Sequence, residues 1–122
     1  MTTMFNTGDM LSRLEGWYVS QCNGTWEHAY GFTLGTIDNP GWTLTVDLAE
    51  TEWASREFSN VRIKRSEHNW LHCWLKDEQF NAAGGPLNLR EMIETFLWFV
   101  DPFYDPAVET PHLSTHETKP LG

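Results

Sequence analysis

The sequence predicts an α+β domain in which a four-stranded antiparallel sheet, made of two hairpins, is flanked by an N-terminal and a C-terminal helix. Apolar residues recur every three or four positions near both ends of the chain, and every second position between them. These periods are typical of helices and strands, respectively. Short segments rich in Asp, Asn, Pro, Gly and Ser separate the alternating runs, and such segments form hairpin turns. The 122 residues suffice for one domain with its own core.

The first helix is expected to begin after Asp9 and to end before Asn23-Gly24. Asp is favourable before a helix because its carboxylate accepts a backbone N–H, and Gly is common just after the last turn. The apolar residues between these limits follow helical spacing: Met10, Leu11, Leu14, Trp17, Tyr18 and Cys22. The pattern predicts one amphipathic helix.

The first hairpin is predicted between Tyr30 and Leu48. Tyr30, Phe32 and Leu34 alternate with small or polar residues, and the segment from Trp42 to Leu48 repeats this alternation. The sequence Asp-Asn-Pro-Gly at residues 38–41 is typical of a tight turn. These residues therefore predict two strands joined by that turn.

The second hairpin follows a polar connection at residues 50–57. Val61 and Ile63 alternate with cationic residues in the third strand, and residues 66–69 form the turn. The fourth strand alternates in the same way. Its core-facing residues are expected to be Leu71, Cys73 and Leu75, and the residues on its opposite side Trp70, His72 and Trp74. Residues 82–86, Ala-Ala-Gly-Gly-Pro, are expected to form a loop.

The second helix is predicted from Asn88, which with Glu91 three residues later forms an N-terminal capping pair. The apolar stripe of this helix consists of Leu89, Met92, Ile93, Phe96, Leu97 and Val100. The chain after Pro102 is rich in Pro, Thr and His. We therefore expect one domain at residues 10–104, an N-terminal extension at 1–9 and a loosely held tail at 105–122.

The charge of the chain limits its partners. It has 17 acidic and 8 basic residues, a formal charge of -9, and no Lys or Arg occurs between Leu14 and Ser55. A phosphate backbone requires a basic surface, so direct nucleic-acid binding is disfavoured. The same charge favours a basic protein partner, although it would also keep a small protein soluble without any partner.

The cysteines and the N-terminus indicate a reducing compartment. Cys22 and Cys73 are too few for a disulfide scaffold, and both fall at positions expected to face the core. Residues 1–10 have neither a charged region nor a long apolar run, so no signal peptide is predicted. No stretch is long enough to cross a membrane. We therefore expect a cytoplasmic protein with free thiols.

Two clusters resemble metal or catalytic sites. His68 and His72 are four residues apart, but four strand residues span about 13 Å, whereas each zinc-bound nitrogen lies about 2.1 Å from its ion. Cys73 is expected on the opposite face of the strand. We therefore predict no metal site.

The second cluster is the run from Cys22 to Gly31, Cys-Asn-Gly-Thr-Trp-Glu-His-Ala-Tyr-Gly. We interpret it as scaffold, with Trp26 filling the corner between helix and sheet and Glu27 or His28 satisfying backbone groups. The alternative is a small hydrolase or ligand-binding domain with a pocket formed by Glu27, His28 and His72. No phosphate-binding loop or Gly-x-Ser-x-Gly motif occurs, so no cofactor and no enzymatic activity are predicted.

One sheet surface has the character of an interaction site. If the alternating apolar residues face the core, the other face carries Thr43, Thr45, Asp47, Arg62, Lys64, Trp70, His72 and Trp74. Trp98 lies opposite the apolar stripe of the second helix. Large apolar groups surrounded by charge mark interaction sites, and Trp and Arg are typical anchors. The alternative is that the first helix or the tail covers this face.

The motifs between Met10 and Val100 form a specific combination. It comprises Trp17, Trp26-Glu27-His28, Tyr30-Gly31, Asp38-Asn39-Pro40-Gly41-Trp42, Asp47-Leu48, Ser66-Glu67, Trp70, Cys73, Gly84-Gly85-Pro86 and Leu89. This combination resembles the immunity protein 53 family of bacterial polymorphic toxin systems. The resemblance implies a non-enzymatic cytoplasmic antidote that binds and blocks the toxin domain encoded beside it.

We therefore predict an immunity protein that acts by stoichiometric occlusion of its toxin. The acidic tract would suit a basic nuclease toxin. No metal, nucleic-acid or membrane partner is expected, and the sequence does not predict an oligomeric state. The predicted partner-binding residues are Glu27, Asp38, Asp47, Glu50, Glu52, Trp70, Trp74 and Trp98.

Overall fold

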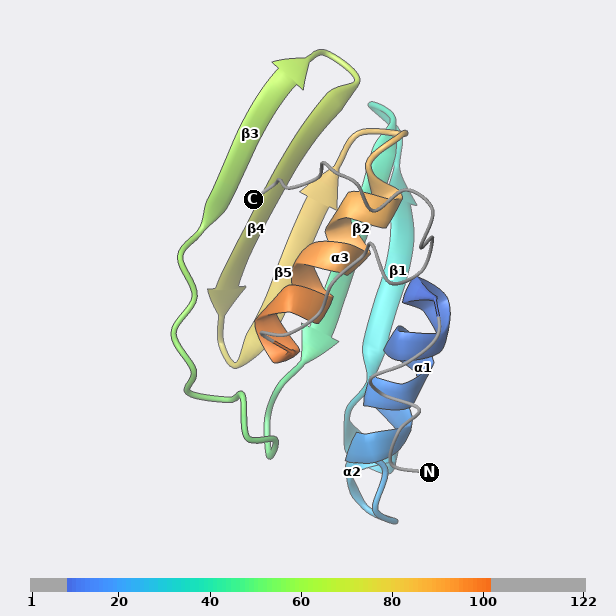
Figure 1. Ribbon diagram of the computed structural model, residues 1–122, viewed down its shortest axis with the longest axis vertical. Coiled ribbons are helices and arrows are strands. Elements are labelled where there is room, and N and C mark those ends of the chain that lie inside the picture. Colours follow the sequence, from blue (N-terminus) through green and yellow to red (C-terminus); the bar gives the residue numbers. More distant parts are fainter. Residues whose placement is uncertain (1–8, 102–122) are drawn as a thin grey trace.

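The computed structural model describes residues 9–101, in which helices cover one face of a five-stranded antiparallel sheet (Figure 1). The elements in chain order are α1 (Met10–Gln21), α2 (Trp26–Ala29), β1 (Phe32–Ile37), β2 (Gly41–Asp47), β3 (Val61–Ser66), β4 (Asn69–Lys76), β5 (Gln79–Gly84) and α3 (Leu89–Val100). The predicted α+β class, the two flanking helices and the antiparallel sheet are confirmed. The predicted tail and residues 1–8 of the predicted extension lie outside the described residues.

The sheet has five strands rather than four, because β5 was not predicted, and its residues 82–84 fall in the predicted loop at 82–86. The strand order is β1-β2-β5-β4-β3, so β5 occupies the centre and pairs with both β2 and β4. Alternate residues of β5 are buried, but only Phe80 among them is large, which makes the apolar pattern weak. Asp77 and Glu78 form the preceding turn with positive φ angles of 55° and 59°, a conformation that Asn and Gly usually supply.

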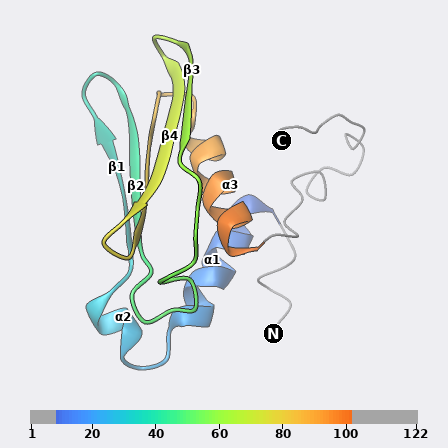
Figure 2. The same ribbon diagram turned by 90° about the vertical axis from the view of Figure 1, so that its left-hand side faces the viewer.

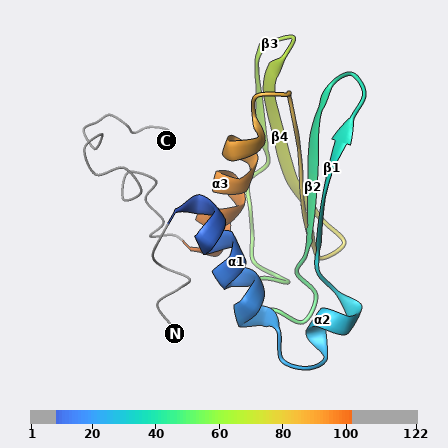
Figure 3. The ribbon, with the colours of Figure 1, turned by 90° about the vertical axis from the view of Figure 1, so that its right-hand side faces the viewer.

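Both long helices lie on the same face of the sheet (Figures 2 and 3). α3 packs over β4 and β5, and α1 lies beside α3. The predicted alternation is confirmed in β2 and β4, where Leu44, Val46 and Cys73 are buried against this layer, whereas Phe32 and Leu34 of the edge strand β1 are exposed. The other face, which we call the uncovered face, carries Trp70 and Trp74 and is not covered by any helix of residues 9–101. The alternative in which the first helix covers this face is wrong.

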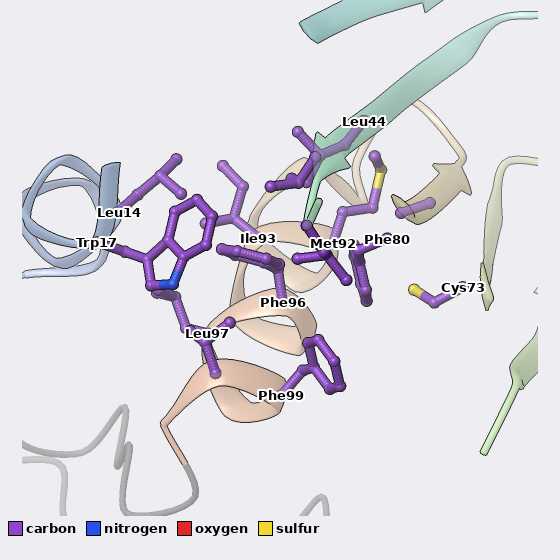
Figure 4. Packing of buried hydrophobic residues seen from close by; sticks show 14 of the residues in the cluster. Leu14, Trp17, Leu44, Cys73, Phe80, Met92, Ile93, Phe96, Leu97 and Phe99 are labelled. Carbon is purple, nitrogen blue, oxygen red and sulfur yellow. The ribbon is translucent and has the colours of Figure 1, made fainter. Parts of the chain in front are cut away.

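The core lies between the sheet and the two long helices (Figure 4). Trp17 of α1 meets Phe96 of α3 edge to face, with ring centroids 5.0 Å apart. Phe96 also contacts Phe80 of β5, at 5.3 Å between centroids. Burial of one Phe side chain contributes about 1.5–3 kcal/mol to stability. A single aromatic cluster therefore holds α1, α3 and the central strand together.

The two helix starts differ in how well they were predicted. The Asp9 carboxylate accepts the backbone N–H of Ser12 at 2.8 Å, which confirms the cap of α1. The Asn88 side chain does not cap the backbone of α3. Its Oδ1 accepts the backbone N–H of Trp70 at 3.1 Å, and its Nδ2 donates to Glu91 at 3.0 Å. Asn88 therefore links the start of α3 to β4.

Candidate functional site

The segment that combines a thiol, a carboxylate and an imidazole forms scaffold. Trp26 begins the short helix α2, is 2% exposed and donates from Nε1 to the carbonyl oxygen of Ala49 at 2.9 Å. The Glu27 carboxylate accepts the backbone N–H groups of Asn23 and Gly24. Hydrogen bonds from the backbone of Glu27 itself, and then of these two residues, hold the pKa of its carboxyl below the ordinary value. The structural roles predicted for Trp26 and Glu27 are confirmed.

The second cluster, His68, His72 and Cys73, is dispersed by β4. His68 lies in the turn before β4, and the side chains of His72 and Cys73 lie on opposite faces of the strand. Within the described part of the chain, no group of three or more His, Cys, Asp and Glu side chains is placed to hold a metal ion. Burial raises the pKa of Cys73 to about 12, so its thiol stays protonated and is a poor nucleophile.

The residues of the alternative enzyme site do not meet. Glu27 and His28 lie in α2, beyond the end of β2, whereas His72 lies within β4 opposite Ala83. A pocket beside His72 is lined by neither Glu27 nor His28. The three side chains therefore do not form a common pocket.

Acidic residues gather at the end of the sheet where β2 and β4 finish and α2 lies (Figure 1). The backbone N–H of Leu48 donates to the carbonyl oxygen of Glu78 at 2.8 Å, and Trp26 reaches Ala49 through its indole. We call this region the acidic end, and its carboxylates are Glu27, Asp47, Glu50, Glu52, Asp77 and Glu78. Tertiary structure thus joins Asp77 and Glu78 to the acidic tract found in the sequence.

The carboxylates of the acidic end are held in different ways. Asp47 accepts a hydrogen bond from the Gln79 amide at 2.8 Å, so its position is fixed. Glu50, Asp77 and Glu78 are exposed and have positive φ angles. This backbone conformation costs about 1–2 kcal/mol for a residue other than glycine. The three side chains project from tight turns, and none forms an ion pair with another residue of the described chain.

The remaining predicted residues are distributed around the molecule. Trp70 and Trp74 are half-buried on the uncovered face. Trp98 lies on α3 and packs against the core on the helix-covered side. Asp38 lies in the turn between β1 and β2, at the opposite end of the sheet from the acidic end (Figure 1). Because the sheet separates Trp98 from the other two indoles, one flat partner surface cannot contact all three.

Aromatic and cationic side chains contact one another across the uncovered face. The rings of His72 and Trp74 lie with centroids 4.4 Å apart, and Nη2 of Arg62 lies 3.3 Å from Nε2 of His72. Burial, and then the neighbouring Arg62 charge, lower the pKa of His72 below its ordinary value. The imidazole is therefore neutral at pH 7, and its Nε2 accepts the Arg62 N–H.

A pocket of about 390 Å³ opens on the uncovered face beyond the end of β5. β5 stops at Gly84, which pairs with Trp42 on one side and Leu71 on the other. The pocket is lined by Asn39, Arg62, Ile63, Lys64, Glu67, Trp70, Leu71 and His72. The sequence alternation placed Arg62, Lys64, Trp70 and His72 on one face. The pocket itself could not be predicted, because it depends on where β5 ends and β5 was not predicted.

Comparison with known proteins identifies the family. The family model described as immunity protein 53 matches residues 11–101. No curated protein and no solved structure was found to match the chain. Between residues 9 and 101, no helix is long and apolar enough to cross a membrane. The family match covers nearly all of the described residues and agrees with the resemblance of the sequence motifs. The chain belongs to the immunity protein 53 family.

Proposed function

We propose that this immunity protein neutralises a cognate toxin domain in the cytoplasm by binding it one to one, without catalysis. Membership of the immunity protein 53 family supports a toxin as the partner. The acidic end is the observation that supports a basic toxin surface, and a nuclease that binds a phosphate backbone has such a surface. An immunity protein bound there would keep the nuclease from its substrate.

The proposed contact residues have two roles. The exposed carboxylates of Glu50 and Glu52 attract the toxin, because charges of opposite sign mainly raise the rate of association. Trp74, two residues before the end of β4, provides an apolar anchor that slows dissociation. The carboxylates of Glu27 and Asp47 add negative charge while keeping their structural hydrogen bonds.

The other three predicted residues lie farther away. Asp38, Trp70 and Trp98 are outside the acidic end. They would contribute only where the interface extends beyond that end. We therefore place the main contact at the acidic end and Trp74.

The test is inhibition of the purified toxin domain encoded beside this gene. Toxin activity is measured while the immunity protein is added at a toxin concentration well above the dissociation constant. One-to-one occlusion predicts a linear loss of activity that ends at equal amounts of the two proteins. Light scattering of the mixture should give a complex with one copy of each.

Catalytic neutralisation would give a different result. Complete inhibition at substoichiometric amounts would contradict occlusion. The exposed His28 provides a check, because His28→Ala should leave inhibition by occlusion unchanged. Loss of inhibition in this variant, with its fold retained, would also contradict the proposal.

A further inference from the structure

The pocket on the uncovered face has the opposite charge to the rest of the molecule. The chain has a formal charge of -9, yet Arg62 and Lys64 line this pocket. Neither forms an ion pair with a carboxylate of residues 9–101, although Glu67 lies at the same pocket. The adjacent Arg65, in contrast, binds Glu91 at 2.7 Å. Two cations without a carboxylate partner, in so acidic a chain, point to a partner outside the molecule.

One of the two cations, Arg62, is held in place by a neighbouring side chain. The neutral imidazole of His72 holds the Arg62 guanidinium through the 3.3 Å contact, and the ring of Trp74 lies tilted against His72. Because one guanidinium N–H is engaged in this way, its remaining donors are available to a ligand. Trp70 contributes a half-buried aromatic wall. The site therefore suits a group with a negative charge and an adjoining apolar part.

We propose that this pocket is a second toxin-binding site and receives an Asp or Glu side chain of the toxin. The inference rests on the proposed function, because it takes the toxin as the occupant. A guanidinium binds a carboxylate through parallel N–H bonds, and an ammonium adds a second positive charge. Trp and Arg together are typical of the anchoring centre of protein–protein interfaces. The aromatic wall formed by Trp70 favours a protein side chain with an apolar stem over a small free anion.

The pocket and the acidic end together would orient the toxin. The seven residues along β4 from Trp70 to Lys76 span about 20 Å, which fits within an interface of ordinary size, about 800 Å² on each partner. A toxin with a basic region at one end of its contact surface and a carboxylate at the other would match both sites. The reversed orientation would bring like charges together, which is costly. The pocket therefore adds specificity to the attraction at the acidic end.

The experiment compares two charge reversals in the complete chain. Lys64 is exposed, and Lys64→Glu should leave the fold intact. Arg90→Glu makes the same change in net charge on α3, at the other face of the sheet. We expect Lys64→Glu to weaken binding of the cognate toxin domain about tenfold or more, and Arg90→Glu to change it about twofold at most. Calorimetry measures the affinity, and thermal unfolding checks the fold.

The outcomes separate this inference from the proposed function. Wild-type protein that neither binds nor inhibits the toxin would overturn both. Wild-type protein that inhibits normally, with equal affinities for Lys64→Glu and Arg90→Glu, would overturn the inference alone. If Lys64→Glu impairs folding, Lys64→Gln replaces it and should show a smaller loss of affinity in the same direction.

Inorganic phosphate tests whether the pocket instead belongs to a free anion. It is added to the preformed complex and, separately, to the immunity protein alone while tryptophan fluorescence is recorded. In the complex we expect no displacement, because a toxin carboxylate and its apolar stem fill the site together. In the free protein we expect no saturable change, because phosphate has no apolar part to contact the wall formed by Trp70. Displacement of the toxin by phosphate below about 1 mM, with ionic strength held constant, would overturn the inference.

Discussion

At the scale of single residues, the centre of the sheet depends on glycines that leave room for a neighbouring backbone. A Cβ atom on Gly41 would overlap the carbonyl oxygen of Gly84 in the adjacent strand. Gly35, in β1, differs because its nearest neighbour would be the hydroxyl of Thr43 at 3.6 Å, an ordinary contact. The pairing of β2 with β5 therefore requires glycine at position 41, whereas the pairing of β1 with β2 leaves room for a Cβ atom at position 35.

The first prediction is that Gly41→Ala destabilises the fold and Gly35→Ala does not. A clash with backbone cannot be relieved by rotating a side chain, so Gly41→Ala should lower the free energy of unfolding by about 1–3 kcal/mol. Gly35→Ala should change it by about 0.5 kcal/mol or less. Urea unfolding measures both. Equal stability of the two variants would contradict the close approach of β2 and β5.

At the scale of elements, a polar network joins the β3–β4 hairpin to α3. Two N–H groups of Arg65 donate to the two Glu91 carboxylate oxygens, at 3.1 and 2.7 Å. Arg65 also donates to Asn69 at 2.8 Å, and Asn88 donates to the same Asn69 oxygen at 3.0 Å. Arg65 alone of the β3 cations is paired in this way, so its role is structural. This network fixes the hairpin that carries one wall of the pocket.

The second prediction concerns acid stability. The hydrogen bond from Arg65, and then the one from Asn88, hold the pKa of Glu91 below its ordinary value of 4.5. Because the unfolded chain binds this proton more readily, the stabilisation is present above pH 4.5 and is lost as the pH falls through the lowered pKa of Glu91. Both side chains are partly exposed, so the contribution is about 1 kcal/mol.

Urea unfolding as a function of pH provides the measurement. Glu91→Gln should be less stable than the wild type at pH 7, and the difference should shrink as the pH falls below 4.5. The pKa of His72 is lowered from its ordinary value of 6.5. The unfolded chain therefore binds this proton more readily, and the fold loses stability as the pH falls below 6.5. Since this effect is the same in both proteins, it serves as an internal control. A difference independent of pH would contradict the role of the ion pair.

At the scale of the whole molecule, charge is separated along the sheet. The acidic end carries six carboxylates, whereas the cationic pocket lies beyond the opposite end of β5. Sequence distance does not reveal this arrangement, because Asp77 and Glu78 lie closer in the chain to the pocket residues than to Glu50. The return of the chain through β5 places their turn beside the end of β2. The partner is therefore expected to meet two regions of opposite charge.

The third prediction separates attraction from anchoring. Glu50→Lys and Glu52→Lys should each slow association with the toxin several-fold, up to about tenfold, at low salt, and the effect should shrink as salt rises. Trp74→Ala should instead speed dissociation, with little dependence on salt. Glu15→Lys, on the exposed side of α1, is the control for net charge. Surface plasmon resonance at two salt concentrations measures both rates, and the proposal is contradicted if Glu50→Lys and Glu52→Lys change only the dissociation rate, as Trp74→Ala does, without dependence on salt.

Much of the fold could be predicted because its signals are local. Asp9, the apolar stripes of the two long helices and the alternation around Leu44 and Cys73 each depend on neighbours within a few residues. β5 could not be recognised because Ala82 and Gly84 add little apolar signal to Phe80, and its turn uses Asp and Glu. The candidate site was predicted only in part, since Trp70 and Trp74 were correctly assigned to one face, while the separation of Trp98 required the placement of α3.

The sequence by itself determined which side of each helix and of the recognised strands is apolar, and that the chain is acidic, because side-chain spacing and composition decide these properties. Only the tertiary structure decided that both long helices share one face, that β5 enters the centre of the sheet, and that carboxylates collect at one end while a cationic pocket opens near the other. The physical reason is that strand pairing joins residues far apart in the chain through backbone hydrogen bonds. Because these bonds do not depend on particular side chains, the local sequence does not show which strands will pair.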